Sequence, residues 1–389
     1  MNVYELFSVG MVILLGLLGG KIAHRLHVPR VTGYMLTGLI FGPSVINLIS
    51  AETLQEIHML NEIALGLILF AIGGEIQITH LKALGKRVIL VALAESFGAF
   101  ILVFGVTAAV TRDYALATIL GSISIATAPG VILLVVREYK SSGTLTDTLL
   151  AVVAMNNVLC LVVFRLTFAV IQFATGAAAG GVMLDLFMEL IVAVLIGGAI
   201  ATVITYWEQH IDDLSELLLV IIGGLLLGIG LAKTLGISHL LVCLIIGAVT
   251  NNLSMMHRLI YAELRQTEMP FYIAFFVLSG ASLHLDALSQ LGLLGLVYLV
   301  ARPIGKYLGI AWASRRYNAD PVVRKHLGLA LLPQAGVAIG MALLVSEHYP
   351  AFGHVVSTVI LSSVIVYESV GPYLTKLSLA RAGELYPED

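Results

Sequence analysis

Long apolar runs recur from one end of the chain to the other, and they limit it to one class of fold. Thirteen runs of about 20 mostly apolar residues lie between charged or Gly/Pro-rich breaks. Their approximate extents are 5–23, 31–49, 57–77, 88–110, 114–136, 148–173, 182–206, 216–233, 236–253, 269–284, 288–314, 326–346 and 354–375. Only 12% of the 389 residues are charged, which is too few to cover a water-soluble surface. The sequence therefore predicts an all-α integral membrane protein with 13 transmembrane helices.

The basic residues in the connections predict how these helices are oriented. Sixteen Lys and Arg residues fall on one side of the predicted membrane, and only Arg112 and Lys233 fall on the other. Because cytoplasmic connections carry the excess of basic residues, we expect the N-terminus outside and the C-terminus in the cytoplasm. This topology predicts a multi-pass protein of the cell (inner) membrane. The sixteen are Lys21, Arg25, Arg30, Lys82, Lys86, Arg87, Arg137, Lys140, Arg258, Arg265, Arg315, Arg316, Arg324, Lys325, Lys376 and Arg381.

Several classes of function find no support in the sequence. The net charge is −3 with no basic stripe, so we expect no nucleic-acid partner. The eleven histidines show no metal-ligand spacing, and no nucleophile motif or carboxylate pair suggests an enzyme. We therefore expect no enzymatic activity and no cofactor. About a dozen residues follow the last run, so we also expect one membrane domain over residues 1–389 without a soluble regulatory domain.

The two halves of the chain resemble each other at a constant offset. Residues 70–74 (FAIGG) match residues 276–280 (FVLSG), and residues 128–131 (APGV) match residues 334–337 (QAGV), both 206 positions apart. The matching runs are seven spans apart, and an odd shift inverts the second unit relative to the membrane. This pattern predicts an inverted repeat, in which the substrate site lies near the midplane between interrupted helices.

Two apolar runs are interrupted at equivalent positions. One contains the sequence ATAPG at residues 126–130, and the other contains LPQAG at residues 332–336. Proline removes a backbone donor and glycine weakens a helix, so we expect each run to unwind mid-membrane and the two to cross around a cavity. The alternative interpretation is a pair of ordinary proline kinks.

Ionisable and amide side chains inside the runs are the candidate functional residues, because such groups are costly in hydrocarbon. Lys306 lies deep in the eleventh run and is the strongest single candidate. The alternative is a lysine whose side chain reaches the cytoplasmic interface. Asn156 and Asn157 are adjacent in the sixth run and need polar partners, either at a site or between packed helices. Glu368, in the thirteenth run, is a candidate for carrying a proton.

Two further acidic residues are less central to the prediction. Glu95 and Glu189 lie within about two turns of the ends of their runs. For each of them we expect a structural ion pair rather than a role in a site.

Six short motifs together resemble one family. They are residues 38–44 (GLIFGPS), 67–74 (LILFAIGG), 126–129 (ATAP), 275–280 (FFVLSG), 305–306 (GK) and 332–336 (LPQAG). In these residues the chain is similar to the monovalent cation:proton antiporter superfamily, which includes sodium/proton and potassium-efflux antiporters. The resemblance covers essentially the whole chain.

The resemblance implies a fold and a mechanism. It implies a homodimer in membrane lipid, formed through the side of the first span, that exchanges Na⁺ or K⁺ for protons by an elevator-type movement. The dimerisation or panel helices would lie in residues 1–86 and 182–284, and the moving core in residues 87–173 and 288–376. The implied ion-binding residues are Thr127, Ala128, Pro129, Asn156, Asn157 and Gln334, with Lys306 and Glu368 balancing charge or carrying the proton.

One departure from the family pattern opens alternatives. Where proton-coupled members carry Asp-Asp or Asn-Asp, this chain carries Asn156-Asn157, and a carboxamide cannot titrate. We therefore expect a carboxylate-free site in which Lys306 lacks an acidic partner. Three hypotheses remain. Lys306 titrates while a cation binds oxygens of Thr127 and the two asparagines; or Lys306 and the half-helix N-termini carry an anion or a small organic anion; or the protein is a transport-inactive homologue.

Overall fold

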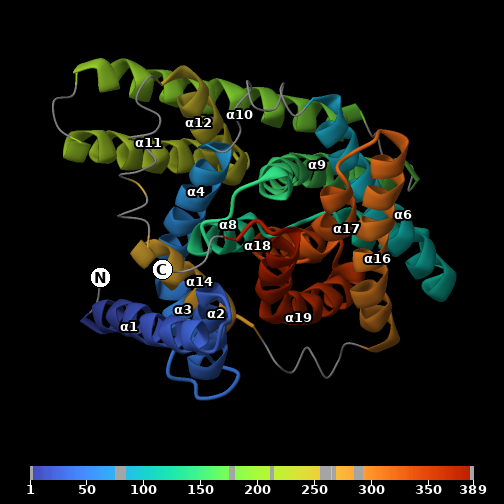
Figure 1. Cartoon of the computed structure of the whole chain (residues 1–389), viewed down its shortest axis with the longest axis horizontal. Helices are drawn as coiled ribbons and strands as arrows, with labels where there is room; N and C mark the ends of the chain where they lie inside the picture. Colours follow the sequence, from blue (N-terminus) through green and yellow to red (C-terminus); the bar gives the residue numbers. More distant parts are fainter. Residues whose placement is uncertain are drawn as a thin grey trace.

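The structure, a computed structural model, is described here for residues 3–74, 85–174, 180–210, 214–254, 264, 269–283 and 292–385. Within these ranges the chain forms α-helices and one short 3₁₀ turn, Glu208–His210, and no strands (Figure 1). The helices are α1 (Val3–Arg25), α2 (Arg30–Phe41), α3 (Ala51–Glu56), α4 (His58–Gly74), α6 (Lys86–Thr111), α7 (Tyr114–Ser124), α8 (Pro129–Glu138), α9 (Thr144–Ala174), α10 (Gly180–Trp207), α11 (Leu214–Thr234), α12 (His239–Leu253), α14 (Met269–Ala281), α16 (Gly292–Arg316), α17 (Pro321–Ala330), α18 (Gly336–His348) and α19 (Pro350–Ala382).

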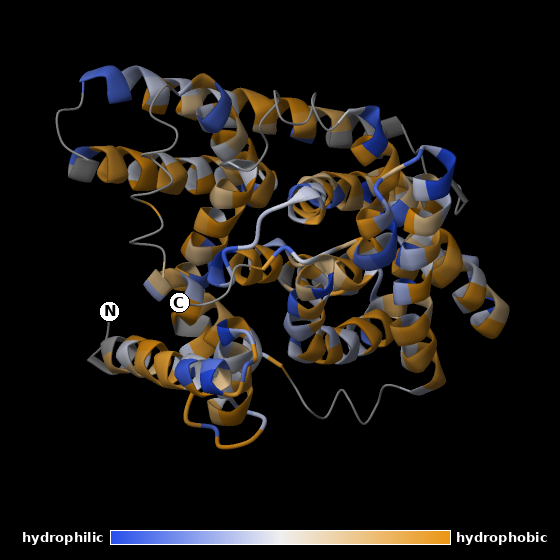
Figure 2. Cartoon of the chain, in the orientation of Figure 1, coloured by the Kyte–Doolittle hydropathy of each residue, from blue (hydrophilic) through white to orange (hydrophobic). Residues whose placement is uncertain are grey.

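The outer surface of the helices is apolar, as the bilayer requires. Large hydrophobic side chains such as Ile101, Leu195 and Leu219 are exposed, and apolar residues dominate the helices in Figure 2. A soluble protein does not leave so many large apolar side chains in water. The chain is therefore a multi-pass integral membrane protein, and the predicted all-α membrane class is confirmed.

Each of the thirteen predicted runs overlaps a helix or a pair of short helices. In the described part of the chain, eight segments are long and apolar enough to span a membrane, and four shorter apolar helices accompany them. The number of thirteen crossings and the orientation of the termini stay predictions. Three of the basic residues behind that orientation, Lys82, Arg258 and Arg265, lie outside the described residues.

The two predicted interruptions are real breaks. The helix α7 ends at Ser124 and α8 begins at Pro129; likewise α17 ends at Ala330 and α18 begins at Gly336. The two unwound segments meet, because the backbone N–H of Ala128 donates a hydrogen bond to the carbonyl of Pro333 at 2.9 Å. Two continuous kinked helices would not present these groups to each other, so the proline-kink interpretation is wrong.

The helices α6 and α16 cross unusually closely, and this contact sets the geometry of the site. A Cβ atom added to Gly305 would lie 2.5 Å from the carbonyl oxygen of Gly98, and one added to Gly309 would lie 2.0 Å from that of Ala94. Only glycine allows backbones to approach so closely. The residues next to these glycines therefore face each other at short range.

Candidate functional site

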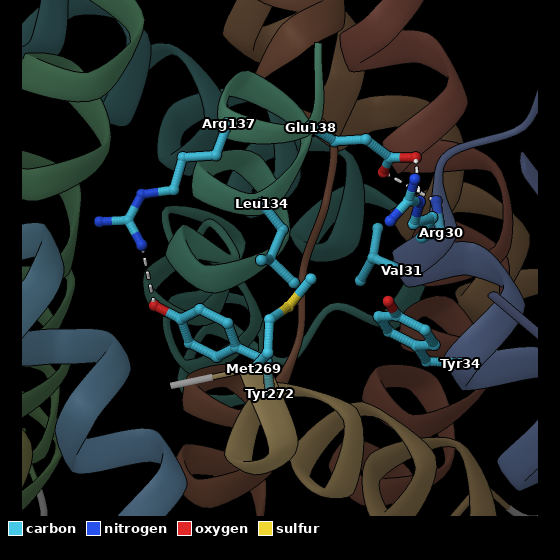
Figure 3. A pocket seen from close by; sticks show the side chains of 8 residues that line it. All are labelled: Arg30, Val31, Tyr34, Leu134, Arg137, Glu138, Met269 and Tyr272. Carbon is cyan, nitrogen blue, oxygen red and sulfur yellow. Dashed lines mark hydrogen bonds and ion pairs between the residues drawn. The ribbon is translucent and has the colours of Figure 1, made fainter. Parts of the chain in front are cut away.

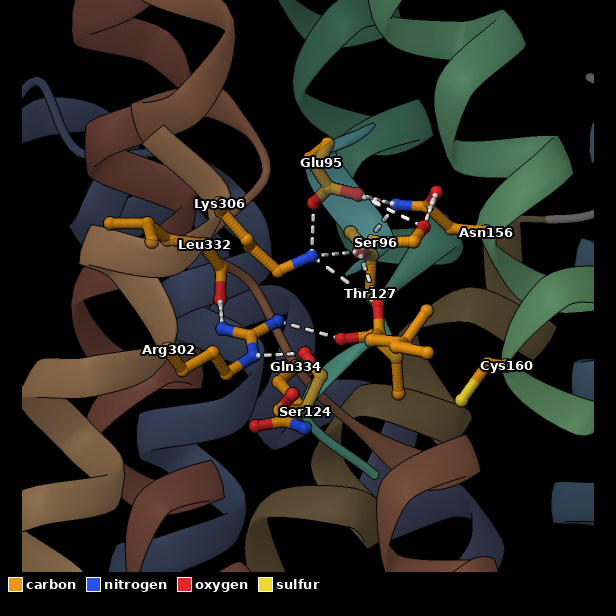
Figure 4. Close-up of polar contacts among 12 residues, drawn as sticks. Glu95, Ser96, Ser124, Thr127, Asn156, Cys160, Arg302, Lys306, Leu332 and Gln334 are labelled. Carbon is orange, nitrogen blue, oxygen red and sulfur yellow. Dashed lines mark hydrogen bonds and ion pairs between the residues drawn. The ribbon is translucent and has the colours of Figure 1, made fainter. Parts of the chain in front are cut away.

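Glu95 and Lys306 form an ion pair beside the crossing of the two broken helices. The first comes from α6 and the second from α16, directly beside the close glycine contact (Figure 4). Both side chains are fully buried, with 0% exposure. A buried charge needs a partner of opposite charge, and here Glu95 and Lys306 are partners for each other.

The ammonium group of Lys306 lies among oxygen atoms. Besides the Glu95 carboxylate, it donates to the backbone carbonyl of Ile125 and to the hydroxyl oxygen of Thr127, both at 3.3 Å. Ile125 directly follows α7, where the unpaired carbonyls at a helix end carry partial negative charge. Lys306 is therefore held by a carboxylate, a carbonyl and a hydroxyl at the unwound segment.

Asn156 completes this cluster from α9. Its amide nitrogen donates to Glu95 at 2.9 Å and to the Thr127 hydroxyl at 3.3 Å, and its amide oxygen accepts from Ser96 at 3.0 Å. Figure 4 shows these side chains converging on one point between α6, α9 and the α7–α8 break. Asn156 thus orients the Glu95 carboxylate, and both its amide nitrogen and its amide oxygen are hydrogen-bonded within the cluster.

Arg302, one helical turn before Lys306, joins the two unwound segments. Its guanidinium donates to the carbonyls of Ser124 (3.0 Å), Ala126 (2.6 Å) and Leu332 (2.8 Å). Ser124 is the last residue of α7, and Ala126 and Leu332 lie in the two unwound segments, so the guanidinium places positive charge beside the negative C-terminal ends of α7 and α17. The arginine is fully buried.

Gln334 lies at the crossing, and its amide group is bonded within the protein. Its amide nitrogen donates to the carbonyl of Ile123 at 3.0 Å and to the Tyr298 hydroxyl at 2.9 Å. These contacts tie the α17–α18 break to the end of α7. The predicted binding residue is thus placed at the crossing, where it supports the position of the two segments.

Asn157 faces away from this cluster. Its amide nitrogen bonds the carbonyl of Val153 on its own helix at 3.0 Å, while its oxygen is buried without a hydrogen-bond partner in the described part of the chain. It lines a small cavity with Leu244 and Val337. Successive helix residues point about 100° apart, so the two asparagines serve different surroundings.

The remaining predicted residues lie at the crossing or apart from it. Ala128 and Pro129 line a small, mainly apolar cavity at the start of α8, together with Phe276 and Ala335. Glu368 is 1% exposed, and neither of its carboxyl oxygens has a hydrogen-bond partner among the described residues. No hydrogen bond within the described ranges links it to the Lys306 cluster.

The prediction that Lys306 lacks an acidic partner is wrong, and so is the idea of a carboxylate-free site. The ion pair expected for Glu95 exists, but its partner is the lysine of the site itself. The ion pair expected for Glu189 also exists, with Arg165, outside this cluster. Sequence distance from the end of a run did not reveal that the α6–α16 contact places Glu95 opposite the lysine.

Sequence reasoning also missed Arg302 and Ser96. One signal was present, because Arg302 and Lys306 are four residues apart and therefore share a helix face. Two buried cations on one face require compensating negative charge nearby. That requirement points to Glu95 and to the carbonyl-bearing helix ends as their partners.

Comparisons with known proteins identify the family and the fold. The sequence matches the family described as "Sodium/hydrogen exchanger, transmembrane" over residues 10–376. It is 24% identical over 380 residues to the ammonium/H(+) antiporter subunit AmhT of Alkalihalophilus pseudofirmus, covering 94% of this chain and 92% of that protein.

Two solved structures of the sodium proton antiporter MjNhaP1 from Methanocaldococcus jannaschii share the fold. One, at pH 8, gives a TM-score of 0.75 at 19% identity and covers 98% of this chain and 96% of its own. The other, from electron microscopy, gives a TM-score of 0.81 at 20% identity and covers both chains completely.

Proposed function

Because the chain belongs to the sodium/hydrogen exchanger family, we propose that it exchanges a monovalent cation for protons at the crossing of α7–α8 and α17–α18. The observation that carries this proposal is the setting of the Lys306 ammonium group. A carboxylate, a carbonyl and a hydroxyl surround it, and these are the hard oxygen ligands that bind a monovalent cation. The ammonium group thus occupies the place that we assign to the transported ion.

Exchange then follows from competition for one set of ligands. A cation that binds Glu95 and the Thr127 hydroxyl displaces Lys306, which leaves its acidic partner and releases its proton to water. When the cation departs on the other side of the membrane, Lys306 takes up a proton there and returns. One cation moves against one proton, Glu95 stays ionised throughout, and the cycle transfers no net charge.

The movement that carries the site across the membrane is also part of the proposal. We assign α6–α9 and α16–α19 to a mobile core, and α1–α4 and α10–α14 to a panel that stays fixed in a homodimer. The Arg302 hydrogen bonds and the Ala128–Pro333 backbone contact support this assignment, because they fasten both broken helices into one unit. An elevator-type displacement of that unit would expose the site alternately to each side.

The transported ion is Na⁺ or K⁺ by family resemblance, and the ammonium/H(+) antiporter relative adds ammonium as a third candidate. The oxygen atoms that bind the Lys306 ammonium group are suited to an ammonium ion, which offers the same N–H donors. Lys306 lies at carbonyl-bearing helix ends and is paired with a carboxylate, which does not favour the anion-carrier hypothesis. The inactive-homologue hypothesis is decided by the assay below.

The test uses purified protein in liposomes that carry an imposed pH gradient. Na⁺, K⁺, Li⁺ or ammonium is added outside, and a pH-sensitive dye reports dissipation of the gradient. Ammonium is compared with protein-free liposomes because ammonia itself crosses lipid. We expect at least one cation to dissipate the gradient without a requirement for charge-compensating ionophore.

Two variants separate the site from general damage. Glu95→Gln removes the carboxylate of the site and abolishes exchange. Glu62→Gln, the control, removes a carboxylate from an ion pair between α4 and α11, both assigned to the panel, and retains exchange. If the wild-type protein forms intact dimers but responds to no cation, the proposal is contradicted. If the protein instead takes up an anion, and Lys306→Arg retains this uptake while Lys306→Ala loses it, the result favours an anion carrier.

A further inference from the structure

A cavity of about 360 Å³ lies between the start of α6, the start of α9 and the turn from α16 to α17. Arg87 and Asn318 at its mouth are exposed, whereas Val91 and Thr148 at its inner end are buried. A water molecule fills about 30 Å³ of the liquid, so the cavity has room for several. We call it the core vestibule, because α6, α9 and α17 all belong to the core that we propose to move.

The core vestibule is aligned with the ion-pair site along two helices. On α6, Val91 lines the vestibule and Glu95 follows four residues later, about 6 Å further along the helix axis. On α9, Thr148 lines the vestibule and Asn156 follows eight residues later, on the same ridge of side chains spaced four apart. The amide nitrogen of Asn156 bonds the Glu95 carboxylate at 2.9 Å. Both ridges therefore run from the vestibule to the site.

Ser314 of α16 provides a polar group between the vestibule and Lys306. It lies eight residues after Lys306 on one ridge of the helix, and Asn318 of the vestibule follows four residues later. Its hydroxyl is buried, with 2% of the residue exposed, and has no hydrogen-bond partner among the described residues. In α19, by contrast, the hydroxyls of Ser363 and Ser369 bond the carbonyl four residues earlier. A buried hydroxyl without a protein partner is a group that an internal water molecule binds.

Apolar side chains separate the vestibule from the ion pair. Val91, Val152 and Ile310 are at most 1% exposed and belong to the same cluster of buried hydrophobic residues. Each lies one helical turn from a residue of the ion-pair site. An apolar constriction of this kind stops water and ions until it widens.

We propose that the core vestibule is the proton route between Lys306 and the cytoplasmic side, with Ser314 as its intermediate hydroxyl and the three apolar residues as its gate. The inference rests on the proposed function, in which Lys306 takes up and releases a proton. On uptake, a hydronium ion gives its proton to the neutral amine and becomes water, and release is the reverse transfer.

The transported cation has a different approach, along α8. A cavity of about 220 Å³ lies between α8 and the panel helices α2 and α14, and Figure 3 shows Glu138 on one side of it and Tyr272 on the other. At the opposite end of α8, a small cavity at Pro129 is bounded by Ile68 of α4 and Phe276 of α14. Both cavities lie between core and panel, where the proposed movement opens the site. The proton and the cation thus have separate routes.

Separate routes require that the gate closes. A gate that stayed open in both positions of the core would let protons cross without a cation. The buried Val91, Val152 and Ile310 side chains exclude water while they are packed together, so they preserve coupled exchange.

The vestibule itself is tested by thiol labelling, which does not depend on transport. We expect Thr148→Cys to react with a membrane-impermeant methanethiosulfonate reagent in inverted membrane vesicles, about tenfold faster than the control Leu149→Cys, because the reaction requires access. Leu149 is the next residue and is 0% exposed, and the native Cys160 and Cys243 are equally buried, so wild type gives the background. Equal rates for the two variants, or reaction only in right-side-out vesicles, overturn the proposal.

Ser314 is tested by removing its hydroxyl. We expect Ser314→Ala to lower the maximal exchange rate about tenfold without changing the apparent KM for the cation, and to increase the solvent isotope effect in D₂O, because proton delivery becomes limiting. Ser314→Thr keeps a hydroxyl and restores most of the rate. The control Ser369→Ala removes a hydroxyl that bonds its own helix and retains the rate. A changed KM with an unchanged maximal rate, or a threonine variant as slow as the alanine variant, refutes this role.

The gate is tested by widening it. We expect Val91→Ala to raise the proton leak of liposomes without added cation about threefold or more above wild type, and the thiol reagent to stop this leak in Val91→Ala/Thr148→Cys. No leak, or a leak that the reagent does not affect, refutes the gate. If wild type shows no exchange at all, the proposed function fails, and labelling of Thr148→Cys still decides whether the vestibule admits water.

Discussion

Replacing Glu95 by Gln isolates the energetic role of the ion pair. The substitution keeps the shape of the side chain and an acceptor for Asn156, but it leaves the Lys306 ammonium group buried without a countercharge. Breaking one partner of a buried pair costs about 3–5 kcal/mol. The remaining contacts of Lys306 to Ile125 and Thr127 place the expected cost near the lower end, at about 3 kcal/mol.

That cost converts into a shift that thermal unfolding resolves. An unfolding entropy of about 2.1 cal/mol/K per residue gives about 0.8 kcal/mol/K for 389 residues, so Glu95→Gln lowers Tm by about 4 °C. The double variant Glu95→Gln/Lys306→Gln removes both charges and regains most of the loss, because a neutral pair leaves no uncompensated charge. Intrinsic fluorescence of the detergent-solubilised protein measures both shifts.

Transport separates stability from function in the same variants. We expect the double variant to recover Tm but not exchange, since it lacks both the carboxylate and the titrating amine. Equal Tm values for the single and double variants would refute the energetic reasoning. Exchange by the double variant would refute the assignment of Lys306 as proton carrier.

Three other substitutions test the surroundings of the pair. Arg302→Gln leaves carbonyls of both unwound segments without their cation, so we expect the free energy of unfolding to fall by about 2–4 kcal/mol and exchange to be lost. Arg302→Lys restores only part of the stability and of the exchange, because lysine lacks the planar guanidinium that binds several carbonyls at once. Gly305→Ala forces α16 away from α6 and abolishes exchange, whereas Gly105→Ala, on an open face of α6, leaves the initial rate of dye recovery unchanged. Asn157→Asp replaces an amide that faces away from the cluster by a carboxylate, so we expect it not to restore exchange to Glu95→Gln. Restored exchange in the double variant would contradict the assignment of Glu95.

The sequence predicted the helices and their breaks because these depend on local chemistry. Apolar runs of the right length define the spans, and Pro129 with Gly130 and Pro333 with Gly336 weaken the helix inside two of them. Both breaks appear where the Pro and Gly residues lie. The inverted repeat, the number of crossings and the dimer stay predictions.

The partners within the site depend on contacts between distant segments, which local patterns do not encode. Glu95 and Lys306 are 211 residues apart and meet because glycines let two helices approach closely. The two asparagines are adjacent in the sequence and look like one motif, yet helix geometry turns Asn156 toward the ion pair and Asn157 toward a separate cavity. Charge balance is a sequence signal that reaches across such distances, because Arg302 and Lys306 share a helix face and need negative partners.

Main-chain oxygen atoms accept many of the hydrogen bonds at the crossing of the two broken helices. Arg302 binds three carbonyls, Gln334 binds another, and the two breaks meet through a backbone N–H and a backbone carbonyl. Every residue type supplies the same carbonyl, so mutation can replace most of the acceptor residues without weakening the joint they form. The side chains around the crossing can therefore change while the main-chain contacts that hold the two breaks together persist.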